Sequence, residues 1–156
     1  MRRLRVLVLV LAEHPKGPRV LMVKDLFNGA WSLPGAEVPE GEAIPDVGVR
    51  VLERQTGLAL RLARLLAVDH APGGTFASEP DTLTVVMDGG FVGKERARVL
   101  AQLPSEVGPL LPMRWATLAE VETEPGYVRH AVVASAQGMP LPVLVDGVSD
   151  METATR

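Results

Sequence analysis

The segment from Trp31 to Leu58 constrains the fold of this chain most, because an acidic, Pro/Gly-rich loop runs directly into a helical pattern. Ile44, Val47 and Val51 recur at i, i+3 and i+7, and a glycine follows where a helix usually stops. These features predict a helix over Ala43–Thr56. The chain must therefore contain a loop–helix unit that packs one apolar face against other elements.

Strand-like runs surround this helix. Val6–Ala12 and Arg19–Lys24 are largely apolar, and the turn residues between them predict a hairpin. The order of elements predicts a mixed α/β (α+β) chain with one compact core. Further strands are expected over Leu60–His70, Asp81–Val92, Met113–Ala116 and Leu141–Val145, and further helices over Leu118–Val121 and Tyr127–Gln137.

Length and composition restrict the domain count and the partners. A chain of 156 residues with 47% hydrophobic and 22% charged residues predicts one folded domain, over residues 1–148, followed by a mobile tail over 149–156. The 16 basic and 19 acidic side chains give a net charge of −3, so no global positive field attracts nucleic acid. The absence of cysteine excludes disulfides and Cys-ligated zinc. We therefore expect any metal to be held mainly by oxygen.

The first residues imitate a signal peptide, because basic residues precede the apolar run Val6–Ala12. This run is too short to span a bilayer, and Glu13 and His14 end it without a small-residue cleavage site. A buried strand of a cytoplasmic protein explains the run better, so we expect no membrane partner.

The segment from Trp31 to Leu58 also carries a recognisable motif. With Ala36 as its first position, Glu42 and Arg50 fit the pattern Gly-x5-Glu-x7-Arg-Glu-U-x-Glu-Glu-x-Gly-U, where U is bulky and apolar, and so do Leu52, Gly57 and Leu58. The segment thus resembles the Nudix box, and the chain is similar to actinobacterial members of the Nudix hydrolase superfamily. The resemblance implies the Nudix fold, an α/β/α sandwich with a mixed β-sheet.

Four fixed positions depart from this pattern: Ala36 replaces the glycine, and Val51, Arg54 and Gln55 replace the three glutamates. In the superfamily these glutamates bind Mg²⁺ ions that bridge the diphosphate of the substrate. Arg54 would repel a dication by about 5 kcal/mol at roughly 6 Å and an effective dielectric constant near 20. The resemblance therefore implies a magnesium site that is very weak or absent.

Other carboxylates are candidates for the missing ligands. By the resemblance, Glu42 and Arg50 are the retained catalytic residues of the box, and Glu42 would pair with Arg50. By the resemblance, Glu106 lies where many members keep a late acidic residue that serves as base or ligand, and the alternative is a solvated loop glutamate. Glu40 and Glu42 are the candidate metal ligands. Glu37 and Glu40 also lie in the loop before the helix, where the alternative is that they are simply solvated.

Three functions follow from these residues. The first is recognition of a nucleotide or nucleoside-diphosphate-linked metabolite through Arg54, Gln55, Glu37 and Glu40, with hydrolysis weak or lost, because a guanidinium suits phosphate oxygens. The second is an active hydrolase whose Mg²⁺ or Mn²⁺ is held by the substitute carboxylates. The third is a homodimer with a decayed site. For the first two functions, loops outside the box would choose the ligand, here Ala71–Pro80 and Lys94–Leu111.

Overall fold

The computed structural model describes residues 2–62, 64–74, 80–101, 111–121, 125–137, 143–145 and 148–149. Glu106, residues 150–156 of the predicted tail and residues 75–79 of the first predicted loop lie outside these ranges. Within the described ranges, no helix is long and apolar enough to cross a membrane. The strands are β1 (Arg2–Ala12), β2 (Arg19–Lys24), β3 (Trp31–Ser32), β4 (Gly35–Glu37), β5 (Leu65–Ala71), β6 (Asp81–Val92), β7 (Met113–Thr117), β8 (Val143–Val145) and β9 (Val148–Ser149), and the helices are α1 (Ile44–Thr56), α2 (Lys94–Ala101), α3 (Leu118–Val121) and α4 (Gly126–Gln137).

β1 is the centre of a mixed sheet. One edge of β1 runs parallel to β6 along almost its whole length, and the other edge is shared by β4 and β2. β4 pairs antiparallel with Arg5–Leu7, whereas β2 pairs antiparallel with Leu11 and Ala12 and completes the predicted hairpin. The strands follow the order β3-β2-β1-β6-β5-β8-β9, with β7 paired to β2. The sheet therefore splits along one side of β1, where β4 and β2 diverge.

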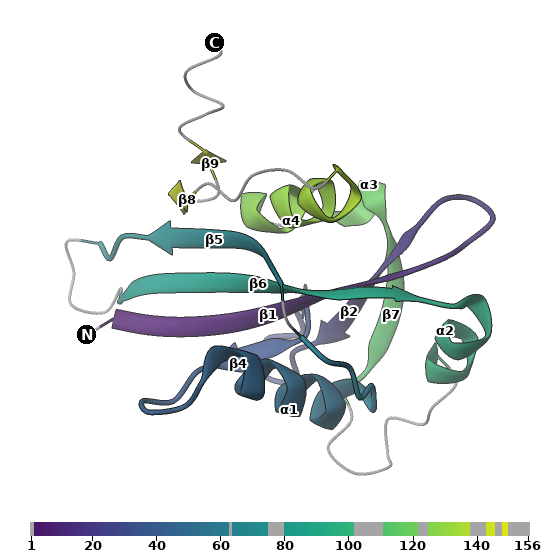
Figure 1. Ribbon diagram of the computed structural model, residues 1–156, viewed down its shortest axis with the longest axis horizontal. Helices are drawn as coiled ribbons and strands as arrows, with labels where there is room; N and C mark the ends of the chain where they lie inside the picture. Colours follow the sequence, from purple (N-terminus) through teal and green to yellow (C-terminus); the bar gives the residue numbers. More distant parts are fainter. Residues whose placement is uncertain are drawn as a thin grey trace.

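Helices cover both faces of this sheet (Figure 1). α1 and α2 lie on one face, and α3 and α4 lie on the other. The side chains of β1 alternate between two buried clusters: Val6 and Val8 pack with α1, whereas Leu7 and Leu9 pack with α4. This two-sided burial explains why the sequence of β1 is continuously apolar rather than alternating. The predicted α/β/α sandwich is confirmed.

Among the longer elements, β5 and α2 differ from the expected ones. β5 begins at Leu65 rather than at Leu60, because Leu58 and Leu62 are buried beside α1 instead of continuing a strand. Lys94–Ala101 is a helix rather than a loop. It buries only Ala97 and Leu100, an i, i+3 pair too small to stand out from the charged residues around it.

Candidate functional site

Gly35 lies at the start of β4, the strand that precedes the helix α1. A Cβ atom at this position would lie 2.2 Å from the backbone oxygen of Val6 and 2.9 Å from the Cα of Leu7. Because both atoms belong to the backbone of the neighbouring strand, no side chain fits there. Gly35 therefore lets β4 approach β1 closely.

The side chain of Gln55 ties the last turn of α1 to the same glycine. The Gly35 N–H donates to Oε1 of Gln55 at 3.1 Å, and Nε2 of Gln55 donates to the Gly35 carbonyl at 3.0 Å. The amide thus offers one donor and one acceptor, as the backbone of a neighbouring strand would. A carboxylate at this position has no donor for the carbonyl. The role of Gln55 toward a ligand stays a prediction.

Val51 occupies the first glutamate position of the box and faces the sheet. Its side chain is 2% exposed and belongs to the buried cluster that also holds Val6, Val8 and Leu52. No polar group of this cluster would compensate a charge placed there, and an unpaired buried charge is strongly unfavourable. Position 51 is therefore part of the core and contributes no ligand.

Arg54 occupies the second glutamate position and lies at the surface. The side chain is exposed, and no hydrogen bond or ion pair joins it to any residue of the described ranges. Its location in the last turn of α1 lets it interact favourably with the carbonyl end of the helix dipole, which is the purely structural explanation for an arginine there. The N–H donors of its guanidinium are nevertheless available to a ligand from solution.

Glu42 and Arg50 brace the loop against the helix. Arg50 donates to the Glu42 carboxylate at 2.5 Å. The Arg50 side chain is 54% exposed and the Glu42 side chain is 39% exposed. The pairing that the resemblance implies is thus present, while the catalytic role of both residues stays a prediction. Glu37 pairs in turn with Arg3 at 3.0 Å on the surface.

The box does not offer the donors that Mg²⁺ requires. Glu40 is exposed, Glu42 is already paired, and no three His, Asp or Glu side chains within the described ranges are close enough to hold a metal ion. Hard dications need several oxygen ligands in one cluster. With a valine, an arginine and an occupied amide on the helix, the described residues do not fit magnesium, and Glu106 lies outside them.

A further polar cluster between β3 and β7 was not anticipated from the sequence. The guanidinium of Arg114 lies 4.7 Å from the ring centroid of Trp31 and pairs with Glu120 at 3.2 Å. Hydrogen bonds from the backbone and then the side chain of Thr117 lower the pKa of Glu120 below its usual range. The cluster forms because β2 pairs with both β3 and β7, a neighbourhood that no local pattern indicates.

Solved structures with this arrangement identify the fold. The MutT protein of Methanosarcina mazei Go1 superposes with a TM-score of 0.61 at 19% identity, covering 89% of this chain and 96% of that one. The Nudix domain of Shewanella oneidensis NrtR, complexed with ADP ribose, gives 0.63 at 19% identity and coverages of 89% and 90%. This chain has the Nudix fold. A Nudix hydrolase from Nitrosomonas europaea agrees, with a TM-score of 0.60 at 17% identity and coverages of 91% and 93%.

The Nudix fold is thus conserved here at a low level of sequence identity. No protein-family model matches the chain, and no curated protein matches it. The fold prediction made from the box is confirmed, and the superposed chains are covered almost completely. Because one fold hosts many functions, the function of this chain depends on the side chains of its box.

Proposed function

We propose that this chain recognises a nucleotide or a nucleoside-diphosphate-linked metabolite at its box helix, with little or no hydrolysis of the diphosphate. The observation that carries the proposal is the exposed Arg54, which has no partner within the described ranges and occupies a position where the Nudix box has a metal-binding glutamate. A guanidinium binds phosphate oxygens directly through its planar fork of donors. A metal-bridged contact is thereby replaced by a direct one.

The same geometry argues against strong catalysis. Val51 is buried and Gln55 is hydrogen-bonded to Gly35, so neither is available to hold an ion that activates water. The ligand class follows from the fold as an analogy: one protein with this fold is seen with ADP ribose, a nucleoside diphosphate linked to a sugar. We take residues 1–148 as one cytoplasmic domain that carries this site.

The test compares ligand binding with and without divalent metal. ADP-ribose, nucleoside triphosphates, dinucleotide polyphosphates and nucleotide sugars are added in EDTA or in Mg²⁺, and the melting temperature is recorded for each. We expect at least one of these ligands to raise the melting temperature equally in EDTA and in Mg²⁺. Titration calorimetry then gives its Kd.

Two arginine variants make the test specific to the site. Arg54→Ala removes the proposed phosphate contact and is expected to weaken binding by about tenfold or more, since hydrogen bonds to charged groups contribute about 1.5–3 kcal/mol. Arg129→Ala is the matched control, because Arg129 is exposed on α4, on the opposite face of the sheet. An equal effect of both substitutions would contradict the proposal.

Product analysis in the same samples separates the alternatives. Turnover that requires Mg²⁺ or Mn²⁺ would show an active hydrolase with substitute carboxylates instead. A dimer in sedimentation analysis that binds none of these ligands would favour a homodimer with a decayed site.

A further inference from the structure

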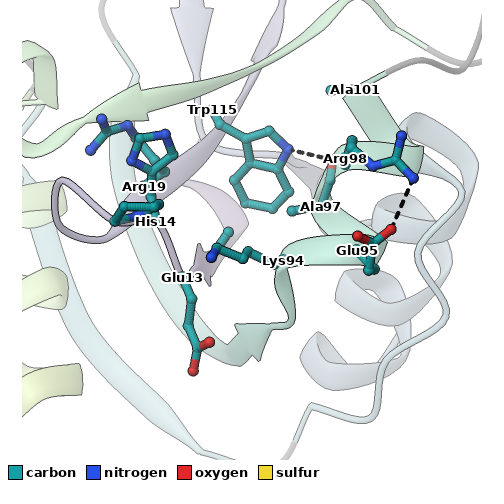
Figure 2. Close-up of a pocket in the computed structure, with 11 residues that line it drawn as sticks. Glu13, His14, Arg19, Lys94, Glu95, Ala97, Arg98, Ala101 and Trp115 are labelled. Atoms are coloured by element: carbon teal, nitrogen blue, oxygen red, sulfur yellow. Dashed lines mark hydrogen bonds and ion pairs between the residues drawn. The ribbon is translucent and has the colours of Figure 1, made fainter.

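A pocket of about 410 Å³ lies where β1 ends and the chain turns toward β2, and Figure 2 shows the residues that line it. Its walls come from the end of β1 and the turn after it, from Arg19 at the start of β2, from α2, and from Trp115 of β7. None of the box residues lines it. Its volume falls within the range of small-molecule sites, about 300–1,000 Å³. We call it the Trp115 pocket.

The inner wall of the Trp115 pocket is aromatic and rigid. Nε1 of Trp115 donates to the backbone oxygen of Ala97 at 3.1 Å, which fixes the indole against α2 and satisfies its only polar group. The small side chains of Ala12, Ala97 and Ala101 leave the volume open around the ring. The pocket therefore presents an oriented aromatic surface to an apolar body.

The charged side chains around this wall are three cations and two carboxylates, an excess of one positive charge. Glu95 pairs with Arg98 at 2.9 Å, so these two side chains largely cancel. The guanidinium of Arg19 is held by the Gly17 carbonyl at 3.0 Å, and the Lys94 side chain extends toward His14 without an ion pair within the described ranges.

The imidazole of His14 responds to the same surroundings. Partial desolvation and then the charges of Arg19, Lys16 and Lys94 lower the pKa of His14 below its ordinary value. Glu13 is the remaining acidic side chain in the wall, and its carboxylate points away from Trp115. Apart from the Glu95–Arg98 pair, the wall thus carries two cationic side chains, Arg19 and Lys94, and one carboxylate, that of Glu13.

We propose that the Trp115 pocket binds a small organic anion with an aromatic or apolar body. The body packs on the indole of Trp115, and the anionic group reaches the Lys94 ammonium and the Arg19 guanidinium at the pocket mouth. Lys94 is also the first residue of α2, where the helix dipole favours an anion. The inference is independent of the function proposed for the box.

The experiment uses 1-anilinonaphthalene-8-sulfonate as the probe and Trp115 as the reporter. The chain has two tryptophans, so the Trp31→Phe background leaves Trp115 as the only one. The neutral N-phenyl-1-naphthylamine has a similar body without the sulfonate and tests the need for an anion. Saturable quenching at one anionic probe per chain is expected, with at least about tenfold weaker binding of the neutral probe.

Variants of α2 locate the bound probe. Lys94→Gln is expected to weaken binding of the anionic probe about tenfold and to leave the neutral probe unchanged within about twofold. Arg96→Gln is the matched control on the same helix, because Arg96 is exposed but does not line the pocket. Ala101→Phe fills the pocket and should abolish binding, whereas Arg54→Ala in the box should have no effect.

Each opposite result would overturn the inference. Quenching that does not saturate, equal affinity for the anionic and neutral probes, or equal effects of Lys94→Gln and Arg96→Gln would each show that no anion site exists at Trp115. If Ala101→Phe fails to fold, the comparison of the exposed Lys94 and Arg96 still decides the question.

Discussion

Replacing Gln55 with alanine removes the two hydrogen bonds that tie α1 to β4 and leaves both polar groups of Gly35 without their partner. Each bond contributes about 0.5–1.5 kcal/mol net, so the free energy of unfolding should fall by about 2 kcal/mol for this partly buried pair. For a domain of this size that corresponds to a loss of about 4–8 °C in melting temperature. Urea denaturation followed by circular dichroism measures the change directly.

Glu53→Gln is the matched control for this prediction. Glu53 is exposed on the same helix turn, and no hydrogen bond or ion pair joins its side chain to β4, so its substitution should change stability by less than about 0.5 kcal/mol. A loss below about 0.5 kcal/mol for Gln55→Ala as well would refute the account of Gln55 as the link between helix and strand.

Gln55→Glu tests whether the donor of the amide is what matters. The ionised carboxylate offers only acceptors to the Gly35 carbonyl, whereas the protonated carboxyl regains a donor. The folded state therefore raises the pKa of the introduced carboxyl above its ordinary value near 4.3. The stabilising contribution is present below that ordinary value and is lost as pH rises through the folded value. The stability gap to the native chain should widen between about pH 4 and pH 8, and a constant gap would contradict the prediction.

Three further outcomes follow from the structure. Val51→Glu places a carboxylate in the core and should cost about 3 kcal/mol or more in denaturant unfolding, so an unchanged midpoint would show that position 51 is not committed to packing. A double-mutant cycle on Glu42 and Arg50 should give a coupling energy below about 1 kcal/mol that shrinks with added salt, because both side chains are well exposed. A hydrogen bond from Arg2 is the largest cause that lowers the pKa of Asp81, so the stabilisation by this carboxylate is present at neutral pH and is lost as pH falls below its ordinary value near 4. As the pH is lowered, the melting temperature of Asp81→Asn should therefore fall less steeply than that of the native chain. Parallel curves of melting temperature against pH would contradict this prediction.

The sequence predicted those elements whose burial appears as a local pattern of apolar residues. β1 is buried on both faces and appears as an unbroken apolar run, and the bounds of β6 match the prediction at both ends. α1 has apolar residues at helical spacing and is followed by Gly57, which adopts the left-handed conformation. The end of α1 was therefore predictable from the sequence. The short strands β3 and β4 were missed, because two or three residues are too few to show a period.

The chemistry of the box depends on contacts between distant segments, which no local pattern indicates. Helical spacing places positions 51, 54 and 55 close together, but only the pairing of β4 with β1 brings Gly35 within reach of Gln55. The same is true of the Trp115 pocket, since His14, Lys94 and Trp115 come from separate segments. The loop prediction over Lys94–Leu111 missed α2 and with it this pocket.

Direct recognition of phosphate by Arg54 without a metal is the central claim, and titration calorimetry with ADP-ribose tests it most directly. The account predicts the same Kd in EDTA and in Mg²⁺, about tenfold or more weaker binding for Arg54→Ala, and no change for Arg129→Ala. Binding that appears only when Mg²⁺ is added would contradict it.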